Sequence, residues 1–275
     1  MFDAVIEMLS YPFMTRAFLV GSLVALCSAL LGVSLVLKRY SMIGDGLSHV
    51  GFGAMAIAAA MNAAPLTVAI PVVIVAAILL LRISGNAKIK GDAAIALIST
   101  TSLAVGVMVI SLTTGMNTDV YNYMFGSILA MSAEDVKLSL VLSVFVLILF
   151  IVFYHKIFAI TFDETFARAT GVKAGVYNTL IAVLTAVTIV LGMRMMGALL
   201  ISSLIIFPAL TSMRVCRTFK SVIINAAVIS VVCLIAGVTL SYVAATPPAG
   251  ASVVLANLVM MVLYTVVGAV KNHMR

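Results

Sequence analysis

The sequence predicts an all-α integral membrane protein, a polytopic bundle of eight or nine transmembrane helices. Of its 275 residues, 64% are hydrophobic and only 9% are charged. Soluble domains carry about 25% charged residues, so this chain has too few charges to solvate the surface of a globule. Its mean hydropathy is +1.28, and its apolar runs approach the roughly 20 residues that a helix needs to cross a bilayer. We therefore expect a single transmembrane domain over residues 1–275.

Nine apolar runs follow one another along the chain, separated by short polar breaks. In order they cover residues 18–37, 42–60, 66–81, 93–112, 138–154, 177–191, 197–207, 222–243 and 253–270. The seventh run is short, and Arg194 interrupts the chain just before it. This run is either a half-helix or one part of a broken element with the sixth run. The number of spans is therefore eight or nine.

The basic residues orient these runs. They gather in five of the breaks, at 38–39, 82–90, 155–173, 214–220 and 271–275. These breaks alternate with breaks that contain a single cation, Arg194. Because Lys and Arg collect in cytoplasmic loops, we expect the five clusters to be cytoplasmic and the N-terminus to be outside. This placement accounts for the net charge of +7 without a nucleic-acid partner.

Asp45 and His49 stand out as two ionisable residues within one apolar run. Their four-residue spacing places both on one face of a helix. Ionisable residues at membrane depth are costly and usually functional. A carboxylate with an imidazole is a ligand pair for a divalent ion such as Zn²⁺ or Mn²⁺. The alternative is a structural Asp–His hydrogen bond between packed helices.

Two further expectations concern this pair. Lys38 is expected to mark the cytoplasmic boundary, which places His49 roughly 15 Å further along a helix. Four glycines flank the pair: Gly44, Gly46, Gly51 and Gly53. They permit either close contact between helices or an unwound stretch around a site. Two ligands do not complete a four-coordinate site, so a second copy of the chain is expected to supply the other two.

Weaker candidates lie elsewhere. Three acidic residues are expected on the outer side: Asp119, Glu134 and Asp135. They either attract a cation, meet a delivery protein or belong to a solvated turn. Arg194 either caps a half-helix or lines the path. Asp163 and Glu164 are expected to form ion pairs near Arg168 in a cytoplasmic loop. A methionine patch suggests adaptable packing, with soft-metal ligation as the alternative: Met193, Met195 and Met196.

The segment 208–220 is the second informative feature. Pro208 is expected to break the seventh run, and the stretch after it to form a short amphipathic helix at the cytoplasmic face. Its cations are Arg214, Arg217 and Lys220. Such a helix either docks into the groove of a partner or serves only as a positive anchor. The sequence has no GxxxxGK[ST] phosphate loop, so an ATPase, if transport is ATP-driven, must be another chain.

The segment GDGLSH at 44–49 resembles the GD-x-[LI]-[SA]-H motif of the ABC-3 family, the membrane subunits of bacterial zinc and manganese importers. Four further segments are similar to that family, in the same order over nearly the whole chain: 121–136, 162–172, 197–214 and 246–255. Gly46 departs from the pattern, because many relatives carry Ala or Thr there, but this removes no ligand. The amino-acid sequences of segments 121–136 and 183–217 most resemble those of the high-affinity zinc permeases, which favours zinc over manganese.

The resemblance implies a homodimeric permease of the bacterial cytoplasmic membrane, with a type II importer-like arrangement of helices. It also implies two cytoplasmic ATPase subunits that bind ATP and an extracytoplasmic metal-binding protein. Asp45 and His49 match the ion path, and residues 208–220 match the region that couples to the ATPase. The chain itself would then be no enzyme and would hold no cofactor, with Zn²⁺ or Mn²⁺ as its cargo.

Three other functions compete with this interpretation. A secondary, ion-coupled metal transporter would work without an ATPase and would usually contain an inverted repeat. GDGLSH occurs once, which counts against such a repeat. An ABC permease for a chelated metal, such as a siderophore complex, or for cobalamin would need a wider path. An intramembrane metalloprotease would need a motif such as HExxH, which the sequence lacks.

Overall fold

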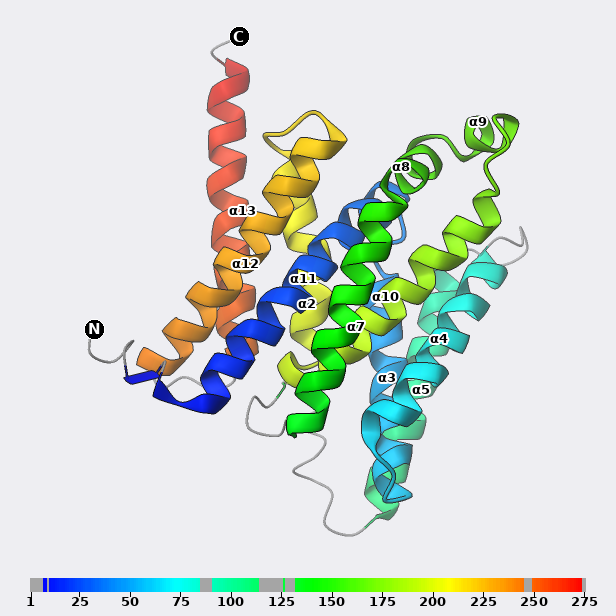
Figure 1. Ribbon diagram of the computed structural model, residues 1–275, viewed down its shortest axis with the longest axis vertical. Coiled ribbons are helices and arrows are strands. Elements are labelled where there is room, and N and C mark those ends of the chain that lie inside the picture. Colours follow the sequence, from blue (N-terminus) through cyan, green and yellow to red (C-terminus); the bar gives the residue numbers. More distant parts are fainter. Residues whose placement is uncertain are drawn as a thin grey trace.

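The computed structural model describes residues 7–8, 10–84, 91–113, 126, 132–244 and 249–273. This part of the chain is helical, without strands (Figure 1). Its helices are α2 (Pro12–Leu37), α3 (Ile43–Ala60), α4 (Pro65–Ser84), α5 (Gly91–Leu112), α7 (Ala133–Val152), α8 (Tyr154–Phe162), α9 (Glu164–Ala169), α10 (Ala174–Met196), α11 (Ala198–Met213), α12 (Phe219–Val243) and α13 (Ala249–His273). Residues 245–248, which belong to the break before the ninth run, and the residue Asp119 lie outside the described residues.

Eight of the described helices are long and apolar enough to cross a membrane, so the protein is a multi-pass membrane protein. They are α2, α3, α4, α5, α7, α10, α12 and α13. The one remaining predicted run, the seventh, is α11, a helix of 16 residues. At a rise of 1.5 Å per residue it measures about 24 Å, which is shorter than the roughly 30 Å of a hydrocarbon core. The expectation of eight or nine spans is therefore confirmed.

The two ends of the bundle differ in charge. Figure 1 shows the last turns of α2, α4, α11 and α13 at one end, together with α8 and α9. The segments that carry the basic clusters follow or include these elements, as the alternating pattern predicts. By the positive-inside rule, this end is cytoplasmic. The N-terminal end of the described chain lies at the opposite, outer end.

The sixth and seventh runs are separate helices joined by one residue, Gly197. Arg194 was expected to interrupt the sixth run, but α10 continues through it to Met196. Gly197 has φ 86° and ψ 160° and ends α10 while it begins α11. This backbone region is essentially restricted to glycine, since a Cβ clashes there. The chain reverses direction at Gly197 because no side chain prevents it (Figure 1).

The prediction of a short amphipathic helix after Pro208 is wrong. Pro208 lies inside α11, which continues to Met213. The turn that follows ends at Thr218, whose side chain accepts a hydrogen bond from the backbone N–H of Ser221 and so caps α12. Proline removes one backbone donor, but neighbouring helices compensate for such a loss in transmembrane helices. The prediction treated Pro208 as it would act in an isolated helix.

Glycines allow the closest helix crossings of the bundle. A Cβ at Gly32 of α2 would lie only 2.1 Å from the carbonyl oxygen of Ile205 in α11. A Cβ at Gly53 of α3 would lie 2.7 Å from the carbonyl oxygen of Ser102 in α5. Close backbone approach is the usual basis of helix association in membranes, where hydrophobic burial offers little. These contacts fix α11 against α2 and α3 against α5.

Replacement of Gly197 by alanine should destabilise the protein. Alanine would have to adopt the backbone conformation of Gly197, which costs about 1–3 kcal/mol for residues other than glycine. We expect a lower Tm in thermal unfolding of the purified, detergent-solubilised Gly197→Ala variant. Gly175→Ala is the matched control, since a Cβ there meets nothing within 4 Å. Equal Tm values for the two variants would contradict the role given to Gly197.

Candidate metal site

Asp45 and His49 lie on one face of α3, near its cytoplasmic start. Asp45 is in the first turn of the helix, and His49 follows one turn later. Residues 38–42 form a turn between α2 and α3 rather than helix. The estimate of 15 Å from Lys38 counted these residues as helix and is therefore too long. From its first residue, Ile43, the helix carries His49 about 9 Å along its axis.

The two side chains approach each other without a direct hydrogen bond. His49 Nε2 lies 3.7 Å from Asp45 Oδ2. Two ligand atoms of a tetrahedral Zn²⁺ ion, each at about 2.0–2.2 Å, lie about 3.4 Å apart. The observed separation therefore allows both atoms to bind one ion after a small movement. The side chains are 44% (Asp45) and 23% (His49) exposed in the single protomer.

Ser202 of α11 is a site residue that the sequence analysis missed. Its Oγ lies 3.5 Å from Asp45 Oδ1 and 3.2 Å from the carbonyl oxygen of Ala198, so one hydroxyl proton serves both acceptors. The carboxylate thus has one oxygen toward Ser202 and the other toward His49. Contacts of this kind orient metal ligands. A serine in an apolar run gave no signal, because only the fold brings α11 beside α3.

The glycines around the pair serve close packing rather than unwinding. α3 is helical throughout. A Cβ at Gly46 would lie 2.6 Å from Ile95 Cγ2 of α5, and one at Gly44 would lie 3.1 Å from Ile205 Cδ1 of α11. Two neighbouring helices therefore press against α3 beside Asp45. The pair sits on a rigid helix whose position is fixed on both sides.

The pair supplies two ligands and no more within the described part of the chain. No group of three or more His, Cys, Asp or Glu residues occurs there. His155 is exposed on α8, away from α3, and the side chain of His273 lies outside the described residues. Cys27 is buried, with Sγ 3.4 Å from the carbonyl oxygen of Ser143. A four-coordinate site would need further ligands from beyond the described residues of this protomer.

The three methionines at the end of α10 pack against two different helices, α2 and α3. Met195 and Met196 reach toward Gly21 of α2, where a Cβ would meet both methyl groups within 2.9 Å. Met193 reaches toward Gly51 of α3, at 3.1 Å. All three are buried. The side chains diverge and fill the space left by glycines, which fits adaptable packing rather than ligation.

Arg194 forms an ion pair near the outer end of the bundle. Its guanidinium nitrogen Nη2 lies 3.7 Å from Asp135 Oδ2, and the two side chains are 15% and 18% exposed. Asp135 also completes a capping box with Ser132 at the start of α7. Arg194 thus connects α10 with α7. Of the two outer acidic residues that are described, Glu134 is the exposed one.

The basic segment 214–220 packs against α8 at the cytoplasmic end of the bundle. Arg214, Arg217 and Lys220 are exposed, whereas Pro208 is buried inside α11 and offers no contact to a partner. Phe219 packs against aromatic rings of α8, with ring centroids 5.2 Å apart at Phe158 and 5.7 Å apart at Phe162. The segment 214–220 therefore lies beside α8, and α8 in turn contacts α9.

Of the two acidic residues expected to form ion pairs near Arg168, Glu164 does so in the structure. Arg168 Nη2 lies 2.5 Å from Glu164 Oε1. Asp163 instead caps α9, because its Oδ1 accepts a hydrogen bond of 2.8 Å from the backbone N–H of Phe166. Glu164 also approaches Lys38, whose Nζ lies 3.4 Å from Oε2. No local sequence pattern predicts this last contact, since the two residues are far apart in the chain.

Comparison with known proteins places the chain among membrane transport proteins. A family model described as the ABC 3 transport family matches residues 10–268. The high-affinity zinc uptake system membrane protein ZnuB of Haemophilus influenzae is 30% identical over 90% of this chain and 94% of its own length. The manganese transport system membrane protein MntC of Halalkalibacterium halodurans is 28% identical over 90% and 85%. A solved structure of PsaBC from Streptococcus pneumoniae in complex with Fab has a TM-score of 0.85 and 26% identity, over 95% of this chain and 94% of that one.

Removal of the Ser202 hydroxyl should weaken metal binding. Loss of a group that orients a ligand typically costs 10–100-fold in affinity, and the long contact to Asp45 favours about tenfold. We expect titration calorimetry of the purified Ser202→Ala variant with Zn²⁺ to show this increase in Kd. Ser203→Ala is the control, because Ser203 Oγ donates to the carbonyl oxygen of Leu200. A wild-type Kd for Ser202→Ala would remove Ser202 from the site.

Proposed function

Because the chain belongs to the ABC 3 transport family, we propose that it is the membrane-spanning permease subunit of an ATP-driven importer for a divalent transition-metal ion. Zinc is the first expected cargo and manganese the second. The relatives named above are membrane proteins of zinc and manganese transport. The chain carries the path for the ion, and the ATP-hydrolysing subunit is a separate protein.

The observation that carries this proposal is the Asp45–His49 pair. Its ligand atoms lie 3.7 Å apart on the membrane helix α3. Ionisable groups are expensive in a bilayer and typically face a polar path or a bound ion. A carboxylate oxygen and an imidazole nitrogen suit both Zn²⁺ and Mn²⁺. The pair would therefore contact or gate the ion on its way through the membrane.

A second copy of the chain would complete the coordination. Both side chains are partly exposed in one protomer, which leaves the pair open toward a partner surface. A two-fold axis beside α3 would bring another Asp45 and another His49 to the same ion. Four ligands would then surround it, as tetrahedral zinc requires. In the homodimer the ion path would run between the two protomers.

The cytoplasmic ATPase would dock on the surface formed by residues 214–220 with α8 and α9. This surface offers three exposed cations: Arg214, Arg217 and Lys220. It also exposes aromatic rings beyond the ends of the spans, since Phe162 is 59% and Phe166 65% exposed. Exposed apolar groups with a charged rim are typical of protein interfaces. The proposed coupling segment is thereby widened to include α8 and α9.

The outer end would receive the ion from an extracytoplasmic metal-binding protein. Glu134 is exposed there at the start of α7, whereas Asp135 is engaged with Arg194 and with its helix cap. ATP binding and hydrolysis would switch the dimer between states open to either side. A secondary, ion-coupled transporter is disfavoured, because the matching family is one of ATP-binding cassette proteins.

Removal of either ligand should abolish transport. In vesicles that contain the permease with its ATPase and binding protein, Asp45→Asn and His49→Ala should each lower ATP-dependent uptake of radiolabelled Zn²⁺ or Mn²⁺ by more than about tenfold, because loss of a direct ligand exceeds loss of an orienting group. Asp92→Asn is the control, since Asp92 is exposed at the cytoplasmic start of α5. Wild-type uptake by either ligand variant would refute the site.

The same vesicles separate the competing functions. Uptake by wild type in the absence of ATP would favour an ion-coupled transporter. Uptake of a metal chelate but not of the free ion would favour a chelate permease. The proposal requires ATP-dependent uptake of the free ion delivered by the binding protein.

Truncation of Phe166 should weaken association with the ATPase. The ring is 65% exposed on α9, and buried aromatic anchors dominate protein interfaces. We expect less ATPase to co-purify with Phe166→Ala than with wild type. Phe145→Ala is matched to it, because Phe145 is 55% exposed on α7 within the membrane span. Equal recovery of the ATPase with both variants would exclude α9 from the interface.

A further inference from the structure

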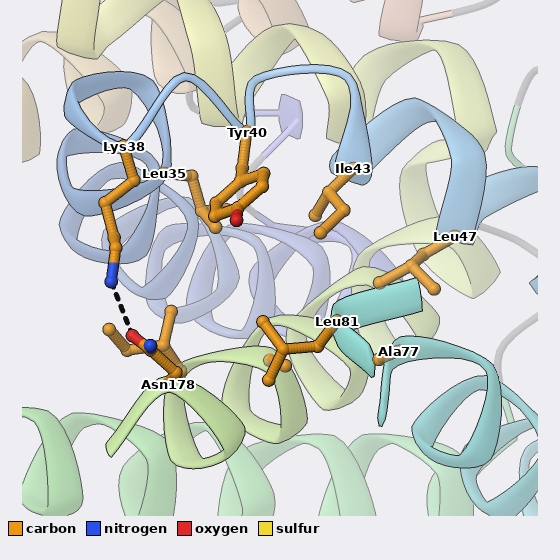
Figure 2. A pocket seen from close by; sticks show the side chains of 10 residues that line it. Leu35, Lys38, Tyr40, Ile43, Leu47, Ala77, Leu81 and Asn178 are labelled. Atoms are coloured by element: carbon orange, nitrogen blue, oxygen red, sulfur yellow. Dashed lines mark hydrogen bonds between the residues drawn. The ribbon is translucent and has the colours of Figure 1, made fainter. Parts of the chain in front are cut away.

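The turn between α2 and α3 lies against the start of α10 at the cytoplasmic end (Figure 2). A small cavity of about 20 Å³, with room for about one water molecule, lies between them. Its lining includes Lys38 and Tyr40 from the turn, Ile43 from the start of α3 and Asn178 from α10. Figure 2 shows the Lys38 ammonium hydrogen-bonded to the Asn178 side chain at the edge of this cavity. The turn is therefore tied to α10.

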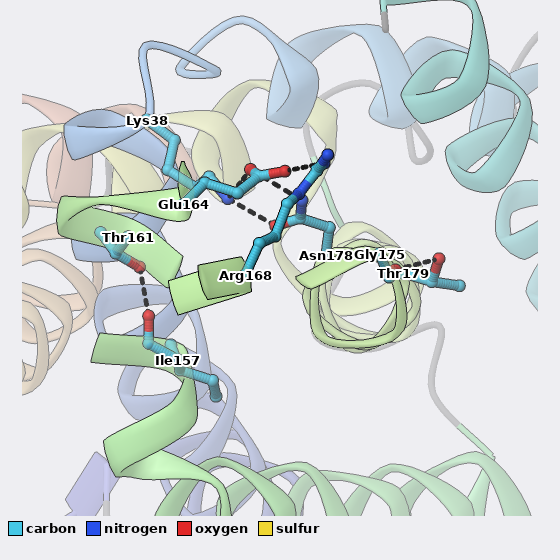
Figure 3. A network of polar contacts seen from close by, with 8 residues as sticks. All are labelled: Lys38, Ile157, Thr161, Glu164, Arg168, Gly175, Asn178 and Thr179. Carbon is cyan, nitrogen blue, oxygen red and sulfur yellow. Dashed lines mark hydrogen bonds and ion pairs between the residues drawn. The ribbon is translucent and has the colours of Figure 1, made fainter. Parts of the chain in front are cut away.

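The same ammonium also reaches α9 (Figure 3). Lys38 Nζ lies 3.4 Å from Glu164 Oε2, and Asn178 Nδ2 donates to this oxygen at 3.0 Å. The other oxygen of Glu164 binds Arg168. One carboxylate of α9 thus holds both the end of α2 and the start of α10. The side chain of Lys38 is only 10% exposed and that of Glu164 is 32% exposed.

The turn that follows Lys38 is stiff. Lys38 ends α2, and Arg39 adopts φ 62°. The backbone N–H of Tyr40 donates to the carbonyl oxygen of Leu35 at 2.8 Å, and that of Arg39 donates to Val36 at 3.1 Å. This pair of bonds is the Schellman arrangement, which usually places glycine where Arg39 stands. α3 begins only four residues later, at Ile43, and Asp45 lies in its first turn.

The carboxylate and the ammonium depend on each other. Burial lowers the pKa of Lys38 from its ordinary value of 10.5, and Glu164 acts against this shift. For Glu164, burial acts to raise the pKa, but the hydrogen bonds from Asn178 and Arg168 and the charge of Lys38 outweigh it, so the pKa falls below 4.5. The pair is partly buried, and because replacing a buried ion pair by apolar residues is often neutral for stability, such a pair suggests a role in specifying position.

We propose that Lys38 and Glu164 are positioning residues that transmit movement of α9 to α3, and so to Asp45 and His49. This inference rests on the proposed function, in which α9 contacts the ATPase. An open groove of about 660 Å³ lies beside the network, lined by Arg82, Glu164, Arg168 and Asn178 among others. It leaves α9 space to move. A displaced Glu164 draws Lys38 with it, and the stiff turn passes the displacement to the start of α3.

The test measures ions imported per ATP hydrolysed by the complete importer in vesicles. Lys38→Met, which keeps the length of the side chain without its charge, should still hydrolyse ATP but import about tenfold fewer ions per ATP, within the range of typical coupling energies. Glu164→Gln should have the same effect. The double variant should be no worse than either single one, because both changes break one contact.

Lys173→Met is the matched control, since Lys173 is an exposed cation at the start of α10 with no ion pair among the described contacts. It should keep the wild-type ratio. An unchanged number of ions imported per ATP in Lys38→Met would overturn the proposal. If hydrolysis and uptake both fall equally, this number is also unchanged, and the result would indicate a role in docking or folding alone. If Lys38→Met does not assemble, Asn178→Ala takes its place, with the same two overturning results. Absence of ATP-dependent uptake by wild type would instead refute the proposed function.

Discussion

The architecture depends on a helix that is too short to cross the bilayer alone. α11 has 16 residues and its last turn lies at the cytoplasmic end, so its first turn lies at membrane depth, where backbone polar groups must find partners within the protein. The bundle solves this by placing α11 in its interior, against α2, α12 and α13. The closest approach is at Gly32, where a Cβ would lie 2.1 Å from the Ile205 carbonyl oxygen. Gly197 makes the arrangement possible, since it lets α10 turn directly into α11.

The position of α11 determines the surroundings of the candidate site. Because α11 also contacts α3, Ser202 comes within 3.5 Å of the Asp45 carboxylate, and Ile205 packs beside Gly44. The ligand pair is therefore held by a rigid helix and oriented by a neighbour, while its open side remains available to an ion and a second protomer. At the cytoplasmic end of the same helix, the turn after Lys38 connects the site to α9. The candidate ion site and the proposed ATPase surface are thus joined through a few stiff contacts.

The sequence predicted the membrane fold and the nine apolar runs, because hydrophobic length is a local property. It also predicted the Asp45–His49 pair, since a four-residue spacing is sufficient to place both on one helix face. It was wrong at Pro208 and at Arg194, where packing by neighbouring helices keeps the chain helical through residues that end isolated helices. Ser202 and the contact between Lys38 and Glu164 had no local signal, because each depends on segments that only the folded bundle brings together.

The central claim is that the ion binds to Asp45 and His49, and X-ray absorption spectroscopy of the zinc-loaded, purified complex tests it most directly. The account predicts a first shell of nitrogen and oxygen at about 2.0–2.2 Å, with scattering typical of imidazole. This imidazole signal should disappear in the His49→Ala variant. Sulfur at about 2.3 Å, which would place the ion on a cysteine, would contradict the account. A spectrum that does not change in His49→Ala would contradict it equally.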